Sequence, residues 1–122
     1  MIAILSAALL LAMGQTSAGD TLIERPTWIR TPTARQIEFA YPAAAKHAGA
    51  PVGVGTIACE IAKDGKLENC QVYKESPADL GFGEAALKLA KYFQMAPLSP
   101  TGKPVAGGTI TVPIVFLSLI HI

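Results

Sequence analysis

The chain has 122 residues, of which 51% are hydrophobic, and its 10 Lys and Arg residues are nearly balanced by 9 Asp and Glu residues. This length suits one compact domain with a leader, since domains usually contain about 100 to 200 residues. No cluster of Lys or Arg occurs along the chain, so the basic surface that nucleic-acid binding requires is not expected.

An uninterrupted apolar stretch spans residues 2–14, and the first charged side chain is Asp20. A bilayer-spanning helix needs about 20 apolar residues, whereas a short apolar run followed by small residues, here 16–18, is typical of a secretory signal peptide. We therefore expect residues 1–18 to be a signal peptide, cleaved after Ala18, and the protein to be exported to the periplasm. The alternative is an uncleaved segment that tethers the protein to the inner membrane.

Residues 19–40 are expected to form an extended leader. Pro26 and Pro32 interrupt this segment, which shows no sustained helical or strand periodicity. Trp28 lies between the two prolines and either packs the leader onto the domain or is an exposed aromatic that binds a partner.

A short helix is expected over residues 41–49. Pro42 suits a first helical position, and the helix-forming residues that follow it end at Gly49. His47 on this helix is expected to be a surface histidine without a catalytic role.

Two segments of alternating polarity, residues 56–61 and 66–74, flank the dipeptide Asp64-Gly65. Asp-Gly between two such segments is typical of a β-hairpin with a two-residue turn. A turn centred on this dipeptide pairs Lys63 with Lys66.

The same register places Cys59 opposite Cys70 and Ile57 opposite Val72. These are the two cysteines of the chain, and in an exported protein a disulfide between them is the favoured state. A metal site would require two further ligands, and two packed free thiols are the remaining alternative.

Apolar residues recur at three- and four-residue spacing between positions 82 and 93, which indicates an amphipathic helix. We expect its apolar face to pack against Ile57, Ile61 and Val72. The apolar residues of this helix are Phe82, Ala85, Ala86, Leu89 and Phe93.

The β-branched segment 109–116 predicts a last strand, and Pro113 within it indicates a sheet edge, because proline has no N–H to donate to a ladder. The element order is helix, strand, strand, helix, strand, which predicts an α+β fold. We expect a three-stranded antiparallel sheet, ordered second, first, third, with two helices packed on one face. Residues 117–122 are an atypical apolar tail, either an extension of the strand or a non-native addition.

No arrangement of residues indicates catalysis. The sequence shows no nucleophile near a base, no paired acids and no phosphate-binding glycine loop. We therefore expect no enzymatic activity, no metal, no cofactor and no small-molecule substrate.

Six short motifs, in order and with suitable gaps, resemble the C-terminal domain of the TonB family. The resemblance covers about residues 41–116, which we take as the folded domain. The motifs are Tyr41-Pro42 with Ala45, the strand that ends at Ile61, the segment 63–67, the segment 82–87, the segment 102–105 and the segment 112–116.

The resemblance implies a periplasmic protein-binding module related to TonB-dependent transport across the outer membrane. In energy-transducing members this domain grips the TonB box of outer-membrane receptors by strand addition, so the implied partner is a protein such as an outer-membrane TonB-dependent receptor. Because the apolar segment is short and no long spacer follows it, we do not expect force transduction by this chain alone.

The strand before Pro113 is the expected partner-binding stretch. A free sheet edge can pair with a segment of another protein through main-chain hydrogen bonds. The residues concerned are Thr109, Ile110, Thr111 and Val112. The alternative is a structural envelope protein that forms a homodimer through the same edge.

Overall fold

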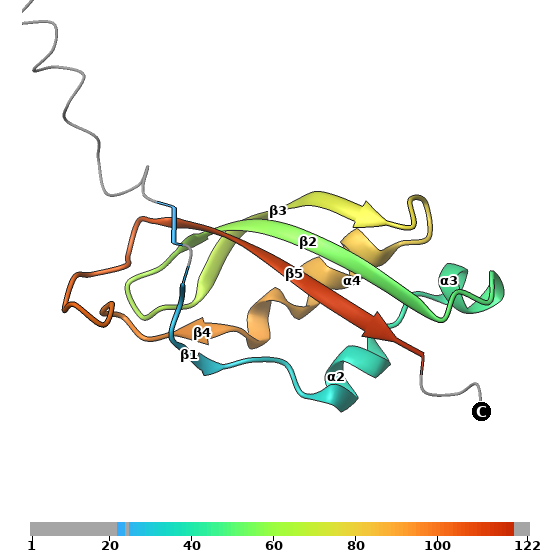
Figure 1. The fold of residues 1–122 in the computed structure, drawn as a ribbon, viewed down its shortest axis with the longest axis horizontal. Coiled ribbons are helices and arrows are strands. Elements are labelled where there is room, and N and C mark those ends of the chain that lie inside the picture. Colours follow the sequence, from blue (N-terminus) through green and yellow to red (C-terminus); the bar gives the residue numbers. More distant parts are fainter. Residues whose placement is uncertain (1–21, 24, 119–122) are drawn as a thin grey trace, which may run out of the picture.

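The computed structural model describes residues 22–23 and 25–118 (Figure 1). The expected signal peptide over residues 1–18 lies outside the described residues, and so do residues 119–122 of the tail. The elements are arranged as one sheet with helices beside it and a second, very short pair of strands.

Three antiparallel strands form the main sheet. They are β2 (Val52–Ile61), β3 (Leu67–Ser76) and β5 (Thr109–Leu117), in the order β3-β2-β5. The central strand β2 pairs with both neighbours in antiparallel fashion. The predicted α+β class, the strand order and the antiparallel sheet are therefore confirmed, and β5 is an edge strand as Pro113 indicated.

The turn between β2 and β3 differs from the prediction. Three residues, 63–65, connect Ala62 to Lys66, and the Ala62 N–H donates to the Lys66 carbonyl (2.8 Å). Gly65 donates its N–H to the Ala62 carbonyl (2.9 Å) and has a φ of 87°. This is a tight turn followed by one left-handed residue, a common three-residue hairpin loop. The predicted two-residue Asp-Gly turn is wrong.

A β-bulge compensates for the odd number of loop residues. Near the turn, Ile61 pairs with Leu67, one residue away from the predicted register. The ladder is then irregular where Asn69, with a φ of 52°, adds one residue to β3. Beyond this bulge Ile57 pairs with Val72, as predicted.

The bulge also brings the two cysteines together. Cys59 and Cys70 form a disulfide, with their Cα atoms 4.1 Å apart, so the predicted disulfide is confirmed. The bond closes a loop with a sequence separation of 11, and the chain-entropy model assigns such a loop about 3 kcal/mol of stabilisation.

The main helix α4 (Phe82–Leu89) continues into the 3₁₀ turn η2 (Ala90–Tyr92) and covers one face of β2 and β3 (Figure 1). The N-cap residue of α4 is Gly81, which has no side chain to cap the helix. Glu75 of β3 supplies the missing cap, because its carboxylate accepts a hydrogen bond from the Gly83 N–H (2.7 Å). A carboxylate at a helix N-terminus is stabilising, since it satisfies free N–H groups and faces the positive end of the helix dipole.

The core lies between α4 and the sheet. Phe82, Leu89 and Phe93 are buried against Ile57 and Ile61, as predicted. Val72 differs from the prediction: its side chain is 41% exposed, because β3 is an edge strand and α4 covers it only in part. The predicted place of Val72 in the core is therefore wrong.

Two glycines allow α4 to approach β2 closely. A Cβ atom at Gly53 would lie 2.1 Å from the ring of Phe82, and one at Gly55 would lie 2.2 Å from the Phe82 carbonyl oxygen. Tyr41 and Phe116 complete an aromatic cluster around Phe82, with ring centroids 5.6 Å and 5.5 Å from the Phe82 ring. The absence of side chains at Gly53 and Gly55 thus creates the space that Phe82 fills.

Within the expected leader, the described residues 22–23 and 25–40 are more structured than an extended segment. They contain the strand β1 (Trp28–Arg30) and the helix α2 (Ala34–Phe39). α2 begins with a capping box, in which Thr33 and Gln36 each bond the other's backbone N–H. β1 pairs with a second short strand, β4 (Gln94–Met95), which follows η2.

The helix expected over residues 41–49 is α3 (Ala43–His47). Ala45 is its buried residue, and His47 is exposed. The tail also begins as an extension of the sheet, because Leu117 ends β5 and the Ser118 N–H donates to the Pro51 carbonyl (2.9 Å).

Candidate functional site

The side chains of β5 alternate strictly between the core and solvent. The even-numbered residues face the helix side and are buried, namely Ile110, Val112, Ile114 and Phe116. The odd-numbered residues Thr111, Pro113, Val115 and Leu117 are exposed. This alternation is the period of a strand with one face packed on a core.

The main-chain groups of β5 alternate in the same way within the plane of the sheet. The Gly108 carbonyl accepts a hydrogen bond from Ile61 of β2 (3.0 Å), and Ser118 donates to Pro51 (2.9 Å), so the even positions are turned toward β2. In an antiparallel ladder the intervening residues must turn their N–H and C=O groups the other way. The main-chain groups of Thr109, Thr111 and the other odd residues therefore point to the outer edge.

Because of this alternation, the four expected partner-binding residues fall into two groups that direct their main-chain groups to opposite sides of β5. Thr109 and Thr111 present main-chain groups to the edge, whereas Ile110 and Val112 direct theirs to β2 and their side chains to the core. Pro113 also falls on an outward position, so its missing N–H does not interrupt the ladder with β2. It leaves the outer edge with a carbonyl acceptor at that point and no donor.

The leader occupies the first part of the edge. Leu22 pairs with Thr109 in a parallel bridge, and the Ile23 N–H donates to the Thr109 carbonyl (2.7 Å). Figure 1 shows this segment crossing the start of β5 before it continues into β1. Thr109 is therefore engaged by the chain itself, a contact that the sequence did not predict.

Trp28 holds the leader in this position. Its ring packs on Phe93 with ring centroids 5.0 Å apart, and next to it the Thr27 carbonyl accepts a hydrogen bond from Ala96 (2.7 Å). Of the two roles considered for Trp28, the structure shows packing. Between this leader and β5 lies a cavity of about 290 Å³, lined by residues that include Ile23, Trp28 and Thr111.

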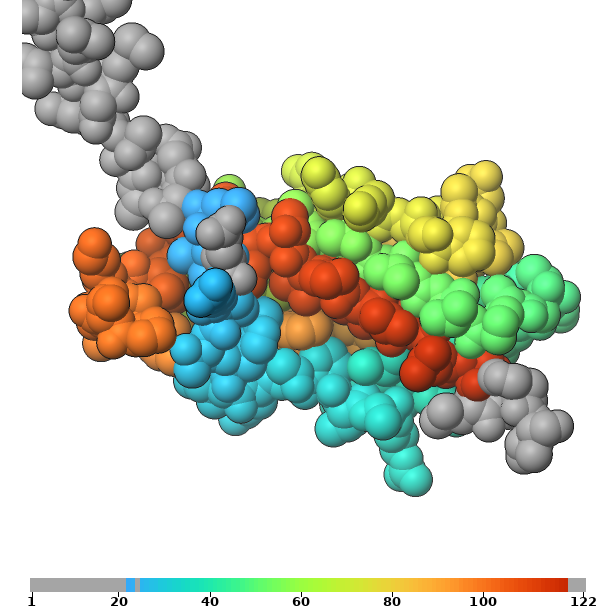
Figure 2. Space-filling view, viewed as in Figure 1, coloured from blue at the N-terminus to red at the C-terminus, as the bar shows by residue number. Residues whose placement is uncertain are grey.

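The helix α2 lies against the other end of the edge. Ala34 and Ile37 on its inner side line a cavity of about 140 Å³ together with Val115 and Leu117. Figure 2 shows β5 running between the leader at one end and α2 at the other. The stretch around Thr111 lies between these two neighbours.

Free thiols, metal-binding clusters and membrane-spanning helices would each indicate another function for the described part of the chain. Cys59 and Cys70 are joined, and no free cysteine is found there. Residues 22–23 and 25–118 contain no group of three or more His, Cys, Asp or Glu side chains placed to hold a metal ion. Within the same residues, no helix is long and apolar enough to cross a membrane.

Residues 37–117, more than half of the chain, match the family described as Gram-negative bacterial TonB protein C-terminal. The chain belongs to this family. The resemblance inferred from the sequence motifs is thus confirmed. TonB C-terminal domains are periplasmic domains associated with energy transduction in the envelope, and they are protein-interaction modules rather than enzymes.

One curated relative is an uncharacterized protein of Caulobacter vibrioides. It is 43% identical over 63 residues, which cover 52% of this chain and 63% of the relative. The chain therefore matches less than two thirds of that relative's length.

Two features of the described chain, both involving residues that precede the family match, were missed from the sequence. The capping box at Thr33 and Gln36 is a Thr-x-x-Gln signature that could have indicated α2. The contacts of the leader with β4 and β5 had no such signal, because β1 and β4 are too short to show a period and they lie far apart along the chain.

Proposed function

We propose that this TonB C-terminal domain is a periplasmic module that binds a segment of a protein partner along the outer edge of β5. The partner segment adds as a strand in the stretch between the leader and α2. The observation that carries this proposal is the outward direction of the Thr111 N–H and C=O groups, set by the alternation along β5. The implied partner is an outer-membrane TonB-dependent receptor.

Strand addition obtains affinity from main-chain hydrogen bonds and specificity from side-chain pockets at alternate positions. Thr111 offers one donor and one acceptor, and Pro113 offers an acceptor alone. The cavity of about 290 Å³ beside Thr111 is lined by Ile23 and Trp28. It suits an apolar side chain of the partner segment.

Periplasmic localisation is part of the proposal. It is supported by the apolar segment 2–14, by the disulfide between Cys59 and Cys70 and by the family's location. Disulfides persist in oxidising compartments such as the periplasm.

The test compares two substitutions at one position. Thr111→Pro removes the outward N–H, whereas Thr111→Val keeps it and preserves the shape of the side chain. Calorimetry measures the binding of synthetic peptides that span the periplasmic N-terminal segments of TonB-dependent receptors from the same bacterium. We expect Thr111→Pro to abolish binding and Thr111→Val to retain it.

The thermal unfolding midpoint of each variant is measured in parallel, because an unfolded protein would imitate a lost edge. A folded Thr111→Pro variant that binds the peptides as tightly as the wild type would show that strand addition on β5 is wrong. Lys103→Ala, an exposed change outside the sheet, is the neutral control.

A second candidate function is self-association through the end of β5. Val52, Val115 and Leu117 are 44%, 50% and 56% exposed, and Val52 is paired with Leu117 across the two strands. These side chains give the edge an apolar end that a second copy could cover. Sedimentation equilibrium would show a dimer that Leu117→Lys converts to monomer, whereas a concentration-independent monomer would exclude this function.

A further inference from the structure

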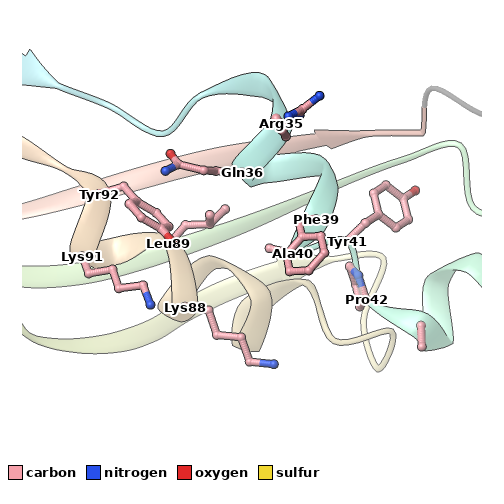
Figure 3. A pocket seen from close by; sticks show the side chains of 11 residues that line it. Arg35, Gln36, Phe39, Ala40, Tyr41, Pro42, Lys88, Leu89, Lys91 and Tyr92 are labelled. Carbon is pink, nitrogen blue, oxygen red and sulfur yellow. The ribbon is translucent and has the colours of Figure 1, made fainter.

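A second surface lies on the opposite side of α2 from the β5 edge. The residues of α2 that line the cavity beside the β5 edge are Ala34, Ile37 and Glu38. Arg35 and Phe39 of α2 line a different hollow, a groove of about 650 Å³ between α2 and α4, and the Phe39 ring lies on its α4 side (Figure 3). The two surfaces use different faces of one short helix, so they can be tested separately.

The floor of the groove is apolar. Leu89 is buried beneath it, and Figure 3 shows the rings of Tyr92 and Phe39 on either side of this leucine. The Phe39 side chain is 92% exposed, the highest exposure of any large apolar residue in the described part of the chain. An aromatic ring in this position is available to pack on a ligand and contributes almost nothing to the domain's own core.

The rim of the groove is cationic. Lys88 and Lys91 extend from the α4 side in the same direction, and Arg35 stands on the α2 wall with its guanidinium group directed away from them (Figure 3). The Lys91 Nζ lies 5.3 Å from the centroid of the Tyr92 ring. Among the residues that the structure describes, no Asp or Glu lines the groove. The ligand that complements this surface therefore carries negative charge next to an apolar side chain.

We infer that the groove between α2 and α4 binds an acidic peptide segment with an apolar anchor residue. The anchor packs between Phe39 and Tyr92 over Leu89, and flanking carboxylates lie near Lys88 and Lys91. A peptide fits these features because the groove is concave and combines a small apolar floor with cations on one rim. This binding goes beyond strand addition, since it uses no main-chain group of β5.

The probe is a fluorescein-labelled decapeptide in which Glu and Asp residues flank two Leu residues. The neutral comparison peptide has Gln and Asn at the acidic positions. Fluorescence anisotropy with the mature protein is measured at low and at physiological salt. We expect the acidic peptide to bind more tightly than the neutral one, and its affinity to fall as salt rises.

Two variants test the groove itself. Phe39→Ala leaves the thermal midpoint unchanged, because the ring is exposed, and weakens peptide binding about ten-fold. The double variant Lys88→Gln with Lys91→Gln weakens binding roughly two- to thirty-fold, since each exposed charge pair is worth roughly 1.5- to 5-fold in affinity. Lys103→Gln removes an exposed cation that does not line the groove, and it leaves binding unchanged.

Three results would overturn the proposal. The first is unchanged binding in the folded Phe39→Ala and double-lysine variants. The second is loss of acidic-peptide binding in a folded Thr111→Pro variant, which would place the peptide on the β5 edge. The third is tighter, Phe39-dependent binding to anionic phospholipid vesicles than to the peptide, which would make a lipid surface the occupant. Acidic-peptide binding that survives Thr111→Pro supports the groove, whatever the fate of strand addition.

Discussion

Gly55→Ala should destabilise the domain because it places a methyl group where the backbone of α4 lies close to β2. The new Cβ would lie 2.2 Å from the Phe82 carbonyl oxygen and 2.9 Å from the Ala86 Cβ. Ordinary contact needs about 3.4 Å, so the backbone of α4 would have to retreat by 3.4 − 2.2 = 1.2 Å. That movement would also strain the hydrogen bond between the Gly83 N–H and the Glu75 carboxylate.

Overpacking of this kind typically costs about 1 to 3 kcal/mol. Replacing a glycine by alanine raises the free energy of unfolding by about 0.4 to 1 kcal/mol where the backbone is compatible, because the unfolded chain loses conformational freedom. Since the clash is with backbone rather than with a flexible side chain, we expect a net loss of about 2 kcal/mol in the free energy of unfolding. Urea unfolding of the oxidised protein, followed by far-UV circular dichroism, measures it.

Gly49→Ala is the matched control for this experiment. A Cβ at Gly49 would meet nothing within 4 Å, and its φ of 71° makes the cost one of backbone strain, about 1 kcal/mol. If Gly55→Ala were as stable as the wild type, α4 would not lie against β2 as the structure shows, and the account of the Phe82 cluster would be refuted.

Three further predictions concern the core, the disulfide and the leader. Leu89→Ala should lower the free energy of unfolding by about 2 to 5 kcal/mol in urea, because the side chain is 1% exposed; a change below about 0.5 kcal/mol would contradict its burial. Thiol titration of the denatured, unreduced protein should detect no free thiol at Cys59 or Cys70, and two free thiols would exclude the disulfide. Thermal unfolding followed by Trp28 fluorescence should coincide with circular dichroism, because Trp28 packs on Phe93; an earlier fluorescence transition would show that the leader unfolds separately.

The sequence was sufficient to predict those elements whose local hydrophobic pattern matches the face that they bury in the core. The period of the segment 82–93 identified the buried face of α4, and alternation identified β2 and β5. Pro113 correctly indicated the edge strand, because a missing N–H is tolerated where the strand has no neighbour. These features depend on residues close together along the chain.

The errors arose where two local irregularities compensate or where contacts are long-range. A three-residue turn and the bulge at Asn69 shift the hairpin in opposite directions, so the predicted Cys59–Cys70 pairing was correct although the predicted turn was wrong. The bridge between Leu22 and Thr109, with the Ile23 N–H donating to the Thr109 carbonyl, joins the start of the described chain to the start of β5. No periodicity could reveal it, and it changes which part of the β5 edge is open.

The leader contacts also determine where an isolated fragment of this protein could be cut. The family match begins at residue 37, within α2, which starts at Ala34. A fragment trimmed to that boundary would lose the capping box at Thr33 and the tryptophan that covers Phe93. It would present new apolar surface and a bare strand edge to its neighbours, a combination that favours aggregation. A soluble recombinant fragment should therefore begin no later than Leu22.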